Sequence, residues 1–224
     1  MKSFVLLTEK TWHKSMLNAL ASRENEKWKL IDKNDEFTIE KLQEFKPEFI
    51  FIPHWSYIIP EKIWTAFQCV VFHMTDLPYG RGGSPLQNLI LSGKTKTKIS
   101  AIRVNHGIDT GDVFLKKDLS LLGTAREIFE RATPIILEMI EEIIDKNLEP
   151  IKQEGKPVYF KRRKPEDSAI ENIEYIDMIY NYIRMLDCEG YPNAYIETEF
   201  IKFEFTDARF SNNEILANVR ISKK

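Results

Sequence analysis

Residues 48–73 read EFIFIPHWSYIIPEKIWTAFQCVVFH, and this stretch predicts two buried strands joined by a short helix. Residues 49–52 and 69–72 are unbroken apolar runs, which are typical of strands covered on both faces. Pro60 stands where a helix can begin, because proline is tolerated in a first helical turn. Strands of this kind alternating with helices predict an α/β fold, with a mostly parallel sheet and helices on both faces.

The same alternation extends in both directions along the chain. Further strands are predicted at 4–7, 99–104 and 112–115, and further helices at 11–22, 38–45, 85–91 and 124–146. Residues 150–170 are polar and rich in proline, which indicates a linker or a strap. A helix at 171–186 and alternating residues at 194–221 predict a small C-terminal subdomain with antiparallel strands. We therefore expect a catalytic domain at 1–168 and a subdomain at 169–224.

Composition narrows the classes of function. The 224 residues carry 32 Lys and Arg against 34 Asp and Glu, a net charge of −2, which argues against a nucleic-acid partner. Cys69 and Cys188 are the only cysteines, so no disulfide framework is expected. No leader pattern or bilayer-length apolar run is present, which favours a soluble, cytoplasmic protein without a membrane partner. Neither a dinucleotide-binding glycine motif nor a P-loop appears.

Residues 72–88, FHMTDLPYGRGGSPLQN, hold the most specific local feature. His73 ends an apolar strand, and open α/β sheets bind their ligands beyond such strand ends. Glycines and prolines then crowd around Arg81, which lets the backbone approach a ligand closely. An ordinary surface loop with a histidine at the end of a strand is the alternative interpretation.

Residues 106–113, HGIDTGDV, form a second loop, a tight acidic turn between two predicted strands. Alone it is weak evidence, because Asp and Gly are common in turns. It gains weight beside the first loop, because one loop offers an imidazole and the other a carboxylate. A His–Asp pair suits proton transfer near neutral pH.

Together the two loops resemble the formyltransferases that use formyltetrahydrofolate. The motifs that carry this resemblance are residues 73–85, HMTDLPYGRGGSP, and residues 108–112, IDTGD. Two further stretches are similar to the family: YFKRRKPEDSAI at 159–170, and YNYIRML with GYPNAY at 180–186 and 190–195. The resemblance implies a Rossmann-like catalytic sheet followed by a shortened remnant of a barrel-like appendage.

The resemblance also implies roles for individual residues. His73 matches the family's catalytic histidine and Asp109 its catalytic aspartate, and formyltetrahydrofolate is implied as co-substrate without a metal. The folate is expected against a set of loop residues, namely Leu77, Pro78, Arg81, Gly82, Gly83 and Ile108. The family's oxyanion-stabilising asparagine is replaced by Val71. Candidates for that role are protonated His73 itself, His54, Asn105 and His106, whereas His13 is expected at the surface.

The substrate is inferred from the same resemblance. The short C-terminal region and the neutral charge favour an amino sugar carried on a nucleotide over the tRNA-type members. The strap and tail argue against the glycinamide ribonucleotide-type members, which lack them. Methionyl-tRNA formyltransferase, formyltetrahydrofolate hydrolase and a non-catalytic folate- or nucleotide-binding module stay open as alternatives. The alternating tail would also suit a homodimer contact.

Overall fold

The computed structural model describes residues 1–224, and its contacts divide the chain into two compact units. The first unit comprises residues 1–82, 98–119 and 130–159, and the second comprises residues 83–97, 120–129 and 160–224. The predicted domain boundary between residues 168 and 169 stays a prediction. None of the helices combines the length and the hydropathy that a bilayer-spanning segment needs.

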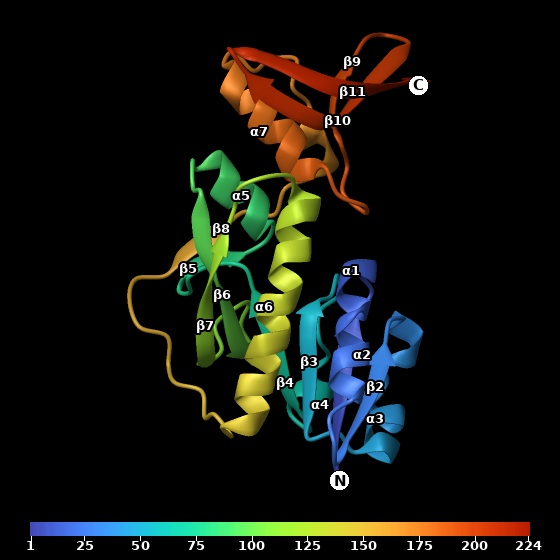
Figure 1. Ribbon diagram of the computed structural model, residues 1–224, viewed down its shortest axis with the longest axis vertical. Coiled ribbons are helices and arrows are strands. Elements are labelled where there is room, and N and C mark those ends of the chain that lie inside the picture. Colours follow the sequence, from blue (N-terminus) through green and yellow to red (C-terminus); the bar gives the residue numbers. More distant parts are fainter. The chain divides into compact units, whose positions relative to one another are not determined.

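A six-stranded sheet with the order β2-β1-β3-β4-β6-β7 forms the centre of the first unit (Figure 1). Its strands are β1 (Lys2–Thr8), β2 (Glu26–Ile31), β3 (Phe49–His54), β4 (Gln68–His73), β6 (Lys96–Arg103) and β7 (Val113–Ser120). The first four run parallel, and β6 is antiparallel to β4. In this register Phe49 lies opposite Gln68, so β3 and β4 end at the same edge of the sheet with His54 and His73.

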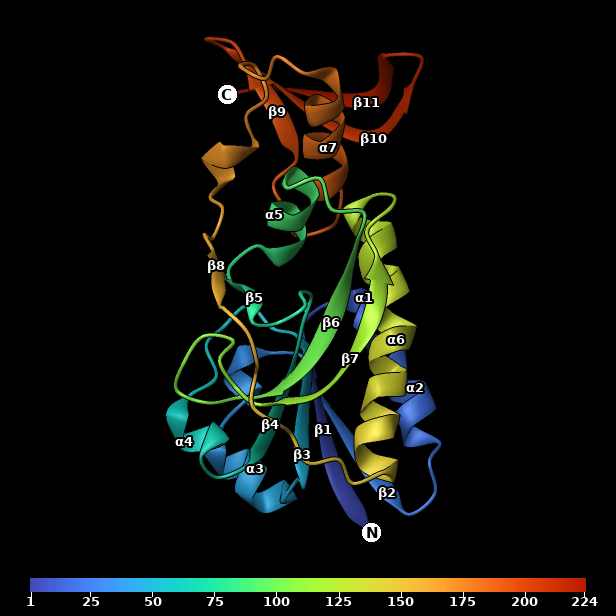
Figure 2. The same ribbon diagram turned by 90° about the vertical axis from the view of Figure 1, so that its left-hand side faces the viewer.

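Helices cover both faces of this sheet. Figure 2 shows α3 and α4 on one side and α2 and α6 on the other. The helices are α1 (Thr11–Lys14), α2 (Met16–Ala21), α3 (Ile39–Phe45), α4 (Glu61–Trp64) and α6 (Ala125–Asp145). The predicted fold class, a mostly parallel α/β sheet between helices, is confirmed.

The unbroken apolar runs follow from this double cover. Val5, Ile50 and Ile52 belong to one core cluster, together with Leu42 of α3 and Ile63 of α4. The alternate residues point to the opposite face, where the Phe4 and Phe51 rings are 6.2 Å apart and both side chains are fully buried. Burying each such side chain contributes about 1.5–3 kcal/mol.

The second unit contains the predicted C-terminal helix and antiparallel strands. Its elements are α5 (Pro85–Leu91), α7 (Ile176–Leu186), β9 (Ala194–Glu197), β10 (Ile201–Ser211) and β11 (Glu214–Lys223), besides the first residues of α6. The three strands form one antiparallel sheet in the order β11-β10-β9. The buried Arg184 of α7 donates from Nη1 to the carbonyl oxygens of Leu121 and Gly123 at 2.8 and 2.9 Å.

Several elements differ from the sequence-based expectation. β2, β5 (Tyr79–Gly82) and β8 (Val158–Phe160) were not predicted. β2 has charged side chains at three of its six positions and pairs only with β1, so it lacks an apolar pattern. The predicted helix at 171–186 begins only at Ile176, and the one at 11–22 is interrupted at Ser15.

Candidate functional site

His73 is the last residue of β4, and its side chain is 7% exposed. Its Nε2 lies 2.8 Å from the carbonyl oxygen of Gly80. Because a carbonyl oxygen can only accept, we assign the Nε2 proton to this hydrogen bond. Nδ1 is then the ring nitrogen that can take up or release a proton.

The loop after His73 is shaped by buried hydroxyl groups. Ser100 Oγ donates to the carbonyl oxygen of Thr75 at 2.7 Å and accepts from the Leu77 amide at 3.3 Å. Gly80 and Gly82 have φ angles of 80° and 106°, a region that glycine enters without steric cost. The glycines predicted to shape this loop therefore do so, by turning the chain back over the histidine.

Asp109 lies on the turn between β6 and β7 and faces the same histidine. Its Oδ2 is 3.6 Å from His73 Nδ1 and accepts a hydrogen bond of 2.8 Å from the Gly82 amide. The distance to Nδ1 is longer than that of a hydrogen bond. The two predicted catalytic residues are therefore adjacent, and a backbone amide of the glycine-rich loop orients the carboxylate.

The candidates for the oxyanion role occupy different places. Asn105 Oδ1 accepts from the Gly107 amide at 3.1 Å and from Thr110 Oγ1 at 2.7 Å, within the Asp109 turn. His106 is exposed. Val71 packs against the apolar cluster of Leu77, Ile102 and Val113. None of these contacts assigns the oxyanion role, which stays a prediction.

His54 lies beside His13. The two rings have centroids 6.4 Å apart, and His13 Nδ1 is 3.0 Å from Thr133 Oγ1. Burial lowers the pKa of His54 to about 4, and Lys10 lowers it further. Burial also lowers the pKa of His13 to about 3. The expectation of a surface His13 was wrong, since its side chain is 1% exposed.

The predicted folate-binding residues differ in exposure. Leu77 is buried in the core cluster, whereas Ile108 is 70% exposed. Pro78, Arg81 and Gly82 are half-buried and belong to the first unit, and Gly83 begins the second unit. Arg81 donates to Gln153, a residue that sequence reasoning missed because it lies in a polar stretch without a motif.

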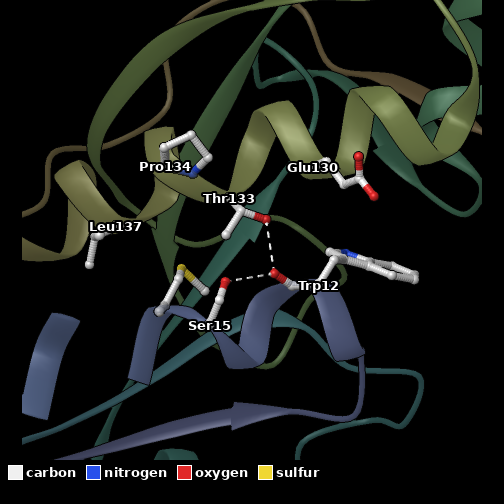
Figure 3. A pocket seen from close by; sticks show the side chains of 7 residues that line it. Trp12, Ser15, Glu130, Thr133, Pro134 and Leu137 are labelled. Carbon is white, nitrogen blue, oxygen red and sulfur yellow. Dashed lines mark hydrogen bonds between the residues drawn. The ribbon is translucent and has the colours of Figure 1, made fainter. Parts of the chain in front are cut away.

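A separate cavity of about 390 Å³ lies in the first unit between α1–α2 and α6 (Figure 3). Its lining residues are Trp12, Ser15, Met16, Glu130, Thr133, Pro134 and Leu137. Ser15 Oγ donates to the Trp12 carbonyl oxygen at 3.2 Å. Neither His73 nor Asp109 lines this cavity. No cluster of three or more His, Cys, Asp or Glu in residues 1–224 is placed to hold a metal ion.

Gly111→Ala is expected to destabilise the protein and displace the Asp109 turn. A Cβ at position 111 would lie 1.6 Å from the carbonyl oxygen of Arg103, so the backbone must shift. We expect a cost of about 3 kcal/mol, at the upper end for an overpacked site. Gly93→Ala is the control, because a Cβ there meets nothing within 4 Å and only its φ of +71° opposes it. That control should cost about 1 kcal/mol. Urea denaturation measures both, and equal losses would contradict this reading of the turn.

Comparison with known proteins gives matches over most of the chain. A model of the formyl transferase family matches residues 8–131, and a model of the methionyl-tRNA formyltransferase C-terminal domain matches residues 165–222. The methionyl-tRNA formyltransferase of Clostridium botulinum (strain Alaska E43 / Type E3) is 30% identical over 173 residues, which are 74% of this chain and 55% of that protein. The chain therefore spans little more than half the length of this relative.

Solved structures give a closer match. A methionyl-tRNA formyltransferase from Clostridium thermocellum is 49% identical, with a TM-score of 0.98 and complete coverage of both chains. HypX from Aquifex aeolicus, solved with tetrahydrofolic acid, is 16% identical with a TM-score of 0.76, over 92% of this chain and 37% of that chain. At that identity the second likeness shows the fold alone.

These findings overturn the expected amino-sugar substrate and the expected absence of a nucleic-acid partner. A sugar N-formyltransferase from Shewanella is only 16% identical, with a TM-score of 0.70 over 100% of this chain and 98% of that chain. The short C-terminal region was a misleading argument, because the Clostridium thermocellum chain has the same extent and carries the tRNA enzyme's name. Net charge was misleading too, because a net charge near zero does not exclude a locally basic patch on the surface.

The formyl transferase model covers more than half of the chain, and its range includes both His73 and Asp109. The chain belongs to the formyl transferase family.

Proposed function

We propose that this protein transfers a formyl group from formyltetrahydrofolate to the α-amino group of methionyl-tRNA. The supporting observation is the adjacent His73–Asp109 pair in a chain that matches, end to end and at 49% identity, a protein named for that reaction. Folate as the donor is consistent with the family and with the tetrahydrofolic acid complex of HypX.

The reaction requires proton transfer in both directions. The amine nitrogen attacks the formyl carbon, a C–N bond forms, and a tetrahedral oxyanion results. The amine then sheds one proton, and the folate nitrogen gains one as its bond to the formyl carbon breaks. His73 Nδ1, next to the Asp109 carboxylate, is the group that moves these protons in our proposal.

We assign the stabilisation of this oxyanion to Asn105, because Val71 offers no hydrogen-bond donor. Both hydrogen bonds of the Asn105 side chain oxygen lie within the Asp109 turn. The amide orientation is thereby fixed, and Nδ2 is the end that can donate to a ligand. A well-placed donor in such a site contributes about 3–4 kcal/mol to transition-state stabilisation.

The basic stretch at residues 161–164, which belongs to the second unit, supports a nucleic-acid partner. The side chains of Lys161, Arg162 and Lys164 are exposed, as phosphate contacts require. Arg163 instead lies over the Tyr182 ring, 5.1 Å from its centroid, and its role is structural. We propose that the three exposed cations contact the tRNA backbone.

An acceptor comparison tests the proposed function. The purified chain is incubated with formyltetrahydrofolate and methionyl-tRNA, deacylated tRNA or free methionine, and both N-formylmethionine and formate are quantified. We expect N-formylmethionine only with methionyl-tRNA, and little formate in any arm. Formate release without an acceptor would replace the proposal with hydrolysis, and binding without either product would replace it with a non-catalytic module.

A further inference from the structure

Gln153 is the single partly buried residue in a stretch that is otherwise exposed. The neighbouring positions from Ile151 to Tyr159 all have exposed side chains. This segment follows α6 and carries no motif. The side chain amide of Gln153 nevertheless takes part in four hydrogen bonds within the first unit.

The oxygen of this amide faces Arg81. Nε and Nη2 of the guanidinium donate to Gln153 Oε1 at 3.2 and 2.8 Å. Both donors carry part of a positive charge, so these hydrogen bonds are stronger than neutral ones. They also fix which end of the amide is the oxygen, because a guanidinium has no acceptor.

The nitrogen of the same amide faces the catalytic turn. Gln153 Nε2 donates to the carbonyl oxygens of Asp109 and Gly111 at 2.9 and 2.7 Å. Asp109 has a φ of 53°, a left-handed conformation that a non-glycine residue adopts only when its surroundings hold it there. Gln153 stabilises this conformation through its hydrogen bonds to the carbonyl oxygens of Asp109 and Gly111.

These contacts close a ring. Arg81 is joined to Gln153, Gln153 to the Asp109 backbone, and the Asp109 carboxylate to the amide of Gly82, which follows Arg81 in the chain. Polarisation by the guanidinium strengthens the donation from Nε2, since linked hydrogen bonds reinforce one another. The glycine-rich loop and the acidic turn are therefore coupled twice, through the Gln153 amide and through the Asp109 carboxylate.

We propose that Gln153 is a positioning residue that sets the geometry of the Asp109 carboxylate relative to His73. Only the kinetic test of this proposal rests on the proposed function. Gln153 does not contact the reacting atoms and acts through Asp109. A displacement of about 1 Å in a reacting group can cost on the order of 10²-fold in rate.

The kinetic test compares Gln153→Ala with Gln153→Glu, using Glu154→Gln as the matched control on the exposed neighbour. We expect Gln153→Ala to lower kcat for methionyl-tRNA by about 10- to 100-fold, with KM for both substrates changed by less than about 3-fold. Gln153→Glu keeps the acceptor for Arg81 but loses both donors to the turn, so it should not rescue kcat. Glu154→Gln should behave like the wild type. A rise in KM alone would overturn the positioning role.

A double-mutant cycle distinguishes positioning from a general loss of structure. In the Asp109→Asn background, Gln153→Ala should lower kcat by less than about 2-fold, because its effect runs through the carboxylate. An equal loss in both backgrounds would overturn the proposal.

A spectroscopic measurement separates this proposal from the function. The imidazole NMR signals of His73 should differ between the wild type and Gln153→Ala but not between the wild type and Glu154→Gln. Unchanged His73 signals in Gln153→Ala would refute the positioning role even if the enzyme is active. Changed signals in a chain without formyl transfer would refute only the proposed function.

Discussion

His73→Asn should lower the rate of formyl transfer to methionyl-tRNA by about 10²- to 10⁴-fold, the usual contribution of a general acid–base group. Asparagine keeps a small polar side chain at the end of β4, although its amide is too short to replace the Nε2 that lies 2.8 Å from the Gly80 carbonyl oxygen. It removes Nδ1, the nitrogen that lies 3.6 Å from the Asp109 carboxylate. The fold should therefore persist while proton transfer is lost. Single-turnover kinetics at saturating folate measure the effect.

Asp109→Asn is the companion variant, and Asp118→Asn is its control. The Asp118 side chain is 91% exposed and pairs with Lys98 at 3.8 Å, far along β7 from the turn. We expect a loss of rate in the first variant and wild-type rate in the second. Thermal unfolding curves for all three variants should stay close to that of the wild type. Wild-type turnover by His73→Asn would contradict its assignment as the acid–base residue.

Acid should destabilise the protein between about pH 6.5 and pH 4 through His13 and His54. Burial lowers the pKa of His13 to about 3 and that of His54 to about 4. In that window the unfolded chain binds protons on both residues and the folded chain does not, so stability falls as the pH falls. Each histidine contributes about 1.4 kcal/mol per pH unit. Two units of acidification would then cost up to about 5 kcal/mol, comparable to the stability of a small protein.

His54→Gln isolates half of this effect. Removing one titrating ring should reduce the slope of unfolding free energy against pH by about one proton over the same window. Urea titrations at several pH values between about 4.5 and 7 supply that slope for the variant and the wild type. An unchanged slope would show that His54 takes up a proton equally in the folded and unfolded chains.

The central sheet could be predicted because its burial leaves a direct trace in the sequence. Residues 49–52 and 69–72 are apolar at every position, since both faces of β3 and β4 are covered. β2 left no such trace, because this edge strand is only partly covered and carries Lys27 and Lys29. A side chain's burial also depends on elements distant in the sequence. His13 was misplaced for that reason, because Thr133 on α6 covers it.

The site shows the same division between local pattern and tertiary contact. His73 and Asp109 each lie in a short stretch with unusual glycine content, so both could be selected as candidates from their neighbours in sequence. Gln153 lies between Lys152 and Glu154 and looks like any polar residue of a loop. Only the fold brings its amide to Arg81 and to the carbonyl oxygen of Asp109.

The most direct measurement of the central claim follows a labelled formyl carbon. Wild-type protein and His73→Asn are each given formyltetrahydrofolate with a ¹³C-labelled formyl group, together with methionyl-tRNA, and the label is located by NMR. The account predicts that wild-type protein moves the label onto the methionyl nitrogen and that His73→Asn leaves it on the folate over the same interval. Label recovered as free formate, or transferred equally by both proteins, would contradict the account.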